Sequence, residues 1–328
     1  MVSSNSWYSC YYRDYDDLTL LGHSVYLFQE GCEPRSKSAG TLKEKFRRDV
    51  VFVEVAQLTD QDKLSGLKGD IKEVGSNVPC DLRSMEDLDR LLRVSVVDNI
   101  YLDASGLSVR VLAPLLKRCL EVSFARKIKG GIYVIYAEPW MYDVKRFSEE
   151  GEYFDLSEKI EGIKPLPGYE RIFPLKDDAI VVPLLGFEGG RLAHILSNYR
   201  DVMQEAVPFV GVPGFRPEYP FVTYYGNRRV LQETSVYANV RYAAAGSIVD
   251  AFLKLVGLKE ERHRVASFIV APIGTKPHTI AALLFCNCFP KSVEIAYDNP
   301  IRNKVRTIGV GKLTVTCVSD LVRVYYGT

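Results

Sequence analysis

Apolar residues gather along the chain in short runs, and loops rich in glycine or proline lead from these runs into helical patterns. The clearest example is the apolar run at 265–270, which enters Ala271-Pro-Ile-Gly-Thr-Lys-Pro-His278 and then an apolar helix-like segment at 279–285. A strand that feeds a helix through a glycine-bearing turn is the repeating unit of α/β domains. The loops at the carboxyl ends of such strands are where these folds bind ligands.

The same pattern occurs once earlier in the chain. A short strand at 99–102 enters a turn at Gly106, and a helix follows at about 110–120. When the two patterns are aligned on glycine, Gly106 lies over Gly274 and Arg110 over His278. This match is the first sign of an internal repeat.

Two more features recur in the same order. Each half opens with a strand that leads to Glu-Gly and an arginine, Arg35 in the first half and Arg191 in the second. Each half closes with a strand that leads to a tyrosine and, three residues later, a proline, at 136–139 and 297–300. Three matches in register favour a duplication over chance.

The sequence therefore predicts an α/β protein of two tandem Rossmann-like domains, each a doubly wound, mainly parallel sheet, related by a pseudo-twofold duplication. The expected boundaries are 1–140 for the first domain with its N-terminal arm, 141–178 for a connecting segment, and 179–328 for the second domain with C-terminal strands. The alternative is a single large α/β sheet whose turns resemble one another because every such turn needs glycine.

Some individual elements carry clear local signals. Ser84 stands at an N-cap position three residues before Asp87, which predicts a helix at 84–92. A strand is expected at 237–242, and an amphipathic helix at 247–256 that Gly257 closes.

Composition and charge narrow the classes of function. The chain has 328 residues, of which 47% are hydrophobic and 25% charged, so it can build full cores. Its formal net charge of +1 argues against a surface for duplex nucleic acid, which needs clustered basic residues. Single-stranded nucleic acid stays open, because the chain has 20 tyrosines and stacking on aromatic rings needs little net charge.

The cysteines and the hydropathy pattern indicate a compartment. The seven cysteines are scattered without the spacing of a zinc site, as expected for reduced thiols in a cytoplasm. The sequence has no signal-peptide pattern at its start and no apolar run long enough to cross a bilayer. We expect a cytoplasmic protein without a membrane partner.

The loop at 274–278 carries the strongest chemical signal. Gly274, Thr275 and Lys276 offer backbone N–H groups at a helix start, a hydroxyl and an ammonium, which together can hold a phosphate or a carboxylate. The spacing is not that of a nucleoside triphosphatase loop. We expect His278, beside a helix N-terminus, to be neutral near pH 7. An ordinary helix-start turn is the alternative interpretation.

Other strand ends add candidates for the same kind of site. Arg191 can grip a phosphate or carboxylate, and Glu188 can accept from a ribose hydroxyl or from a neighbouring arginine; a structural pair such as Glu188 with Arg302 is the alternative. Asp298 and His278 are candidates for an acid–base pair, although no serine or cysteine is placed by motif as a nucleophile. The pattern predicts neither a metal site nor a cofactor.

A duplication would bring both sets of loops to one shared cleft. The predicted ligand-binding residues are Arg35, Ser105, Arg110, Glu188, Arg191, Gly274, Thr275, Lys276, His278 and Arg302.

Two Rossmann-like halves with ligand loops of this kind resemble the CARF and SAVED sensor domains of bacterial antiviral systems. The loops at 185–191 and 272–278 are also similar to those of uncharacterised proteins from bacterial defence gene clusters. The resemblance implies a sensor that binds cyclic nucleotide signals. It carries no catalytic residues over to this chain.

Three functions follow as hypotheses. The first is a ligand-binding sensor subunit of an antiviral defence system, which holds a nucleotide or another phosphate-bearing ligand and acts through a partner effector protein. The second is an enzyme acting on a nucleotide or phosphorylated metabolite through Lys276, His278 and Asp298. The third is a scaffold subunit of a larger complex, in which these loops are only turns.

Overall fold

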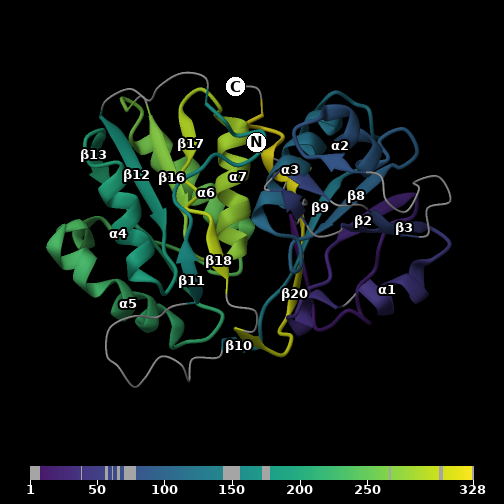
Figure 1. Cartoon of the computed structure of the whole chain (residues 1–328), viewed down its shortest axis with the longest axis horizontal. Helices are drawn as coiled ribbons and strands as arrows, with labels where there is room; N and C mark the ends of the chain where they lie inside the picture. Colours follow the sequence, from purple (N-terminus) through teal and green to yellow (C-terminus); the bar gives the residue numbers. More distant parts are fainter. Residues whose placement is uncertain are drawn as a thin grey trace. The chain divides into compact units, whose positions relative to one another are not determined.

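The chain forms two compact units, residues 1–141 with 307–324, and residues 142–306 with 325–328. The computed structural model describes residues 8–37, 39–55, 58–60, 62–64, 67–69, 79–142, 156–171, 178–265, 267–302 and 306–326. Both units are mixed α/β structures with a mainly parallel sheet, as the sequence predicts (Figure 1).

A sheet of parallel strands with antiparallel additions lies at the centre of the first unit. In spatial order its strands are β1 (Ser9–Tyr12), β20 (Leu313–Cys317), β9 (Ile132–Ala137), β8 (Asn99–Asp103), β2 (Ser24–Phe28), β3 (Val50–Val55) and β6 (Leu67–Gly69). The central four, β9, β8, β2 and β3, are parallel, and β1, β20 and β6 pair antiparallel.

Helices cover this sheet because its strands are apolar on both sides. Leu42 of α1 (Ala39–Phe46) belongs to a core with Tyr26, Phe28 and Phe52. The long helix α3 (Val109–Phe124) packs on β8 and β9 and is contacted by α2 (Met85–Leu92). The remaining elements of the unit are η1 (Pro34–Ser36), β4 (Leu58–Asp60), β5 (Lys63–Leu64), β7 (Cys80–Asp81), β19 (Thr307–Ile308) and α8 (Val318–Val322).

The second unit has a fully parallel sheet. Its strands lie in the order β15 (Arg241–Ala243), β14 (Phe209–Gly211), β12 (Ala179–Leu184), β16 (Phe268–Pro272) and β17 (Val293–Ile295), and β13 (Met203–Ala206) also pairs with β12. Numbered along the chain without β13, this order is 3-2-1-4-5, the strand order of Rossmann sheets.

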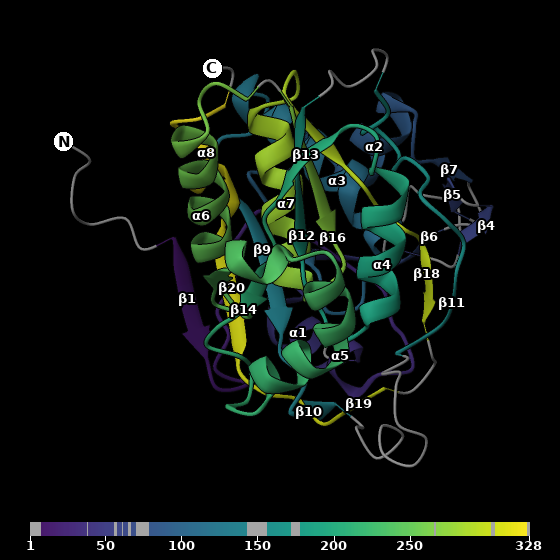
Figure 2. The same ribbon diagram turned by 90° about the vertical axis from the view of Figure 1, so that its left-hand side faces the viewer.

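Helices lie on both faces of the second sheet, as Figure 2 shows. Leu192 of α4 (Gly189–Asn198) and Leu231 of α5 (Tyr219–Glu233) share a core with Ile269 and Ala271 of β16. Phe268, whose side chain alternates to the other face, packs edge-on against Phe285 of α7 (Lys276–Cys288). Helix α6 (Ile248–Glu261) packs along α7. The unit also contains β11 (Ser157–Ile160), β18 (Pro300–Arg302) and η3 (Val236–Asn239). Strand β10 (Met141–Tyr142) lies where the chain passes from the first unit to the second.

Local sequence signals predicted one helix start correctly and two other elements incorrectly. The Ser84 hydroxyl accepts from the backbone N–H of Asp87 at 3.2 Å and starts α2. The expected end of α6 at Gly257 is wrong, because the helix continues to Glu261 through a glycine whose surroundings are open. The expected strand at 237–242 is a 3₁₀ turn followed by the short strand β15.

The C-terminal strands differ from their predicted place. The sequence assigned the tail to the second domain, but β20 pairs with β9 in the first unit along five residue pairs, from Leu313 with Ala137 to Cys317 with Tyr133. An antiparallel strand on that side covers the edge of β9, which would otherwise expose unpaired backbone groups.

Candidate functional site

The carboxyl edge of the second sheet is where the chain changes its direction of travel across the sheet. From β12 the chain builds outward to β14 and β15, and then returns to the other side of β12 to form β16 and β17. The loops after β12 and β16 flank this switch point, the position at which doubly wound sheets bind ligands. The candidate site consists of these loops, 185–190 and 273–276, and of the segment 296–299 after β17.

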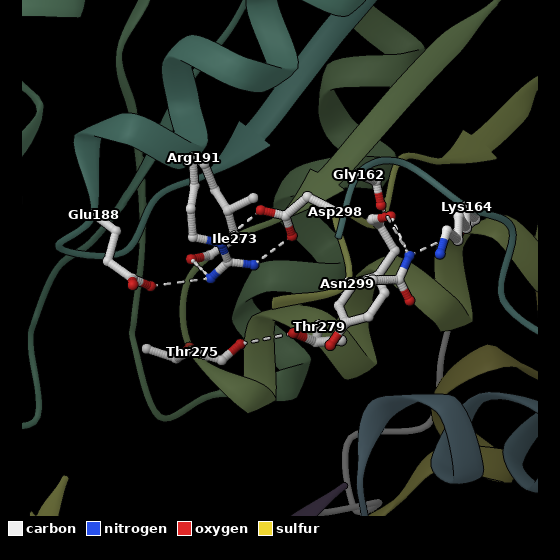
Figure 3. Close-up of polar contacts among 10 residues, drawn as sticks. Gly162, Lys164, Glu188, Arg191, Ile273, Thr275, Thr279, Asp298 and Asn299 are labelled. Atoms are coloured by element: carbon white, nitrogen blue, oxygen red, sulfur yellow. Dashed lines mark hydrogen bonds and ion pairs between the residues drawn. The ribbon is translucent and has the colours of Figure 1, made fainter. Parts of the chain in front are cut away.

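An arginine at the start of α4 links all three segments (Figure 3). Arg191 donates through Nε and Nη2 to the two carboxylate oxygens of Asp298, at 2.7 and 2.6 Å. Its Nη1 donates to the backbone oxygen of Ile273 at 2.9 Å and to Glu188 at 3.3 Å. All three segments therefore depend on one guanidinium group.

This ion cluster is closed to solvent. Arg191 is 2% exposed, Glu188 6%, and Asp298 not at all. Burial by itself would lower the pKa of Arg191, but the hydrogen bonds and charge of Asp298 outweigh it, and the pKa is raised. Arg191 was predicted to bind a ligand, but in the structure its guanidinium donates to other groups of the protein. Glu188, for which a ribose hydroxyl or a neighbouring arginine was expected as the donor, accepts from the arginine.

Glycines allow the two central loops to touch. A Cβ atom on Gly186 would lie 2.7 Å from the backbone oxygen of Ile273, and one on Gly274 would overlap the backbone oxygen of Leu185. Gly274, predicted as a ligand contact, is thus required for the close approach of two backbones.

Thr275, predicted as a ligand contact, caps α7. Its hydroxyl accepts from the backbone N–H of His278 at 3.4 Å and donates to the backbone oxygen of Ala245 at 2.8 Å. The start of α7 therefore already has a side-chain cap. Lys276, the first residue of the helix, is half-buried.

His278 lies inside the protein. It is fully buried, and its Nε2 donates to the backbone oxygen of Ala244 at 3.1 Å, since a carbonyl oxygen only accepts. Burial lowers the pKa of His278, so the ring is neutral near pH 7 as expected, although through burial first. His278 and Asp298 hydrogen-bond to different partners, Ala244 and Arg191.

The start of α4 differs from that of α7. Glu188 occupies the N-cap position but its side chain does not cap the backbone N–H groups of the helix, and its carboxylate accepts from Arg191 instead. Gly189 packs closely on the backbone of Gly226, while a Cβ atom on Gly190 would meet nothing within 4 Å. The first N–H groups of α4 thus lack a side-chain cap, and the space at the Cβ position of Gly190 is open.

Sequence reasoning missed two asparagines that hold this edge in place. Asn227 of α5 donates to the backbone oxygen of Gly186 at 2.8 Å. Asn299 has φ of 48° and donates to the backbone oxygens of Gly162, Lys164 and Tyr297 (Figure 3). The asparagine itself was a usable signal, since this residue type tolerates the left-handed region.

The first unit has an arginine in a comparable setting. Arg35 is 3% exposed and pairs with Glu33 at 2.6 Å. Its Nη1 donates to the hydroxyl of Tyr136 at 3.0 Å and to the backbone oxygen of Ala137 at 3.3 Å. Like Arg191, this residue was predicted to bind a ligand and is engaged with the end of a parallel strand.

Ser105 and Gly106 lie at the switch point between β2 and β8. The Ser105 hydroxyl accepts from the backbone N–H of Ala137 at 2.9 Å. Gly106 allows a close approach, because a Cβ atom there would overlap the backbone oxygen of Gln29. Asp103, which the sequence did not single out, accepts from the hydroxyl of Tyr26 at 2.7 Å.

Two predicted residues remain, Arg110 and Arg302. Arg110, near the start of α3, forms an ion pair with Asp62. The side chain of Arg302 is outside the described residues.

Within the described residues, no group of histidine, cysteine, aspartate or glutamate side chains is arranged to hold a metal ion. No helix in that part of the chain combines the length and apolar character needed to cross a bilayer.

Comparisons with known proteins give little further information. No family model matches the chain, and no curated protein matches it. Among solved structures, the crystal structure of a GsuK mutant is similar with a TM-score of 0.22 and 15% sequence identity, over 87% of this chain and 67% of that chain.

Proposed function

We propose that the carboxyl edge of the second sheet binds a phosphate-bearing ligand, and that the protein senses this ligand rather than converting it. The observation that carries the proposal is the start of α4. At the switch point of a Rossmann strand order, its first N–H groups have no side-chain cap and Gly190 leaves space beside them. Helix N-termini of this kind bind anions through their N–H groups and their dipole.

The charges at this edge of the sheet affect how well an anionic ligand can bind. Arg191 contacts the carboxylates of both Glu188 and Asp298, so its positive charge is engaged within the protein. The N-termini of α4 and α7 and the half-buried Lys276 contribute positive potential at this edge. Lys276 and the N–H groups of Gly189 and Gly190 are therefore the proposed ligand contacts.

Burial favours binding over catalysis. A general acid or base must reach the substrate within hydrogen-bond distance. His278 and Asp298, the two acid–base candidates, are fully enclosed and hydrogen-bonded to other protein groups. The enzyme alternative would need both side chains to leave their present partners.

The proposal extends to the relation between the units. Arg35 and Arg191 both pair with a preceding glutamate and reach the residue after a tyrosine at the end of a parallel strand, Ala137 and Asp298. Gly106 and Gly274 both lie against the backbone oxygen of the residue after the first parallel strand of their sheet. These correspondences support an ancestral duplication and, with the resemblance to CARF and SAVED domains, a cyclic nucleotide as the ligand of an antiviral sensor with a partner effector.

The test is a thermal-shift screen against nucleoside mono-, di- and triphosphates, dinucleotides and cyclic oligonucleotides. One class should stabilise the protein by several degrees, because a ligand at one hundred times its Kd contributes about 2.7 kcal/mol. Lys276→Ala should lose this shift, and chromatography should recover the ligand unchanged. Turnover that His278→Ala abolishes would establish the enzyme alternative. Indifference to every ligand would favour a scaffold.

A further inference from the structure

Strand β1 forms one edge of the sheet in the first unit, and β20 is its only partner among the described strands. Edge strands are commonly protected by charged side chains, proline or a bulge, because their unpaired backbone groups pair readily with other strands. Within β1 there is no charge and no proline, and its register with β20 runs without a shift from Ser9 to Tyr12. Cys10 and Tyr11 are exposed. The outer edge of β1 is therefore available to another strand.

The pairing with β20 determines which backbone groups of β1 face outward. The N–H of Cys317 donates to the backbone oxygen of Tyr8 at 2.8 Å, so these two residues form a hydrogen-bonded pair of the antiparallel ladder. Such pairs alternate along a strand with pairs that are not hydrogen-bonded. The next hydrogen-bonded pair is at Cys10, so the N–H and C=O groups of Ser9 and Tyr11 point away from β20.

These outward groups are arranged symmetrically about Cys10. If a second copy of β1 runs antiparallel to the first, Ser9 of each copy can exchange both backbone hydrogen bonds with Tyr11 of the other. Cys10 then faces Cys10 of the second copy, in a pair without hydrogen bonds. The same surface meets itself in this arrangement, which is the requirement for a twofold interface.

The side chains of the segment Tyr8-Ser-Cys-Tyr-Tyr12 suit the same register, because the sequence has a tyrosine at each end and Cys10 at its centre. Side chains alternate along a strand, so Tyr8 and Tyr12 lie on the same face. Both are half-buried in the single chain. In the paired strands Tyr8 of each copy lies opposite Tyr12 of the other, and aromatic pairs across strands stabilise a sheet. On the other face Tyr11, which is 59% exposed, lies opposite Ser9 of the second copy.

We propose that β1 is the interface for a second copy of this chain, paired antiparallel about a twofold axis at Cys10. The sheet of the first unit then continues from one copy into the other. Addition of a strand to an open sheet edge is a recurring mode of protein recognition, in which backbone hydrogen bonds supply the affinity. The interface belongs to the first unit and does not involve the proposed ligand contacts of the second, so either proposal can fail without the other.

Oxidative cross-linking tests the register. Facing residues in a pair without hydrogen bonds have Cα atoms about 4.5 Å apart, a separation that a disulfide can span. Copper–phenanthroline, used as a probe, should therefore convert the wild type into a covalent dimer on non-reducing gels. Cys10→Ser should lose this dimer, and Cys32→Ser, which removes the other exposed cysteine, should retain it.

A displaced thiol in the same strand is the matched control for the register. In Ser9→Cys, made in a Cys10→Ser background, the two introduced thiols belong to diagonal neighbours with Cα atoms about 7–8 Å apart, beyond the reach of an unstrained disulfide. This variant should lose most of the covalent dimer, although its cysteine lies next to position 10. Cross-linking as fast as that of the wild type would show random collisions and overturn the proposal.

Sedimentation equilibrium under reducing conditions measures the association without a covalent bond. The wild type should form a reversible dimer whose fraction rises with concentration. Tyr11→Pro removes an outward N–H that β20 does not use, and edge strands tolerate proline, so this variant should keep the Tm and lose the dimer. Tyr11→Ala keeps the N–H and should still dimerise.

Two outcomes of the sedimentation experiment overturn the proposal. One is a wild type that stays monomeric up to millimolar concentration. The other is a dimer that survives Tyr11→Pro with an unchanged Tm. If Tyr11→Pro instead lowers the Tm, the comparison of Cys10 with Ser9→Cys decides alone, because neither of those proteins has a proline in β1.

Discussion

Arg191 and Asp298, 107 residues apart in the chain, form a fully buried bidentate pair with N–O distances of 2.7 and 2.6 Å. The pair ties the start of α4 to the segment after β17, on the two sides of the switch point of the second sheet. Because the protein surrounds Arg191, a ligand cannot reach it. The pair therefore affects the stability of the second unit first.

Arg191→Ala should strongly destabilise the second unit. It leaves Asp298 as a buried, unpaired charge, which costs about 3–5 kcal/mol. We expect the Tm to fall by roughly 10 °C, measured by calorimetry. Arg229→Ala, which removes an exposed ion pair with Glu233, is the control and should change stability by less than about 0.5 kcal/mol. A Tm of Arg191→Ala that matches this control would contradict the buried pair.

Gly274→Ala should destabilise the protein, since its Cβ atom would overlap the backbone oxygen of Leu185. Gly257→Ala is the matched control, because the added methyl group meets nothing within 4 Å and lies in α6. There alanine should raise stability by about 0.5–1 kcal/mol through its helix preference. Urea unfolding of both variants measures the contrast, and similar midpoints would disprove the close approach of the two loops.

His278 should make stability fall as the solution becomes acidic. Burial lowers its pKa in the folded protein, so below its ordinary value of 6.5 the unfolded chain binds a proton that the folded protein does not. The stability is present above that value and is lost as the pH falls. We expect Tm to drop more between about pH 7.5 and 5.5 in the wild type than in His278→Gln. The exposed His263→Gln should behave like the wild type; a parallel decline in all three proteins would refute the assignment.

Glu138 should have the opposite dependence on pH. Its pKa is raised by burial, so the folded protein holds a proton that the unfolded chain releases above 4.5. Stability therefore falls as the pH rises through the interval between the two pKa values. Glu138→Gln should equal the wild type in Tm near pH 4 and exceed it near pH 7, as calorimetry at the two pH values would measure. A variant that is less stable at pH 7 would indicate a structural carboxylate.

The sequence predicted those parts of the fold that short-range patterns determine. Apolar runs followed by glycine turns located β8 and β16, and Ser84 located a helix start through its own cap. The place of β20 could not be read in this way, because pairing with β9 joins residues about 180 apart and leaves no local pattern. Gly257 gave a wrong helix end, because a glycine ends a helix only where the backbone must turn, and α6 continues through it.

The candidate site divides in the same manner. Gly274 and Arg191 lie at a carboxyl edge because topology alone brings the loops after parallel strands together. That these loops contact a ligand stays a prediction. Whether Arg191 meets a ligand or Asp298 depends on side-chain packing between segments far apart in the chain, which spacing does not encode. Asn227 was missed because its role depends on a neighbour from another element.

The most direct test of the central claim compares Gly190→Ala with Gly257→Ala in calorimetric titrations of whichever phosphate-bearing ligand stabilises the wild type. Both glycines lie in helices with open space at the Cβ position, so both variants should fold. If the start of α4 binds the ligand, the methyl group on Gly190 should weaken affinity about tenfold or more by hindering the N–H contacts, and Gly257→Ala should bind as the wild type does. Equal affinities in the two variants would contradict a ligand at this edge of the sheet.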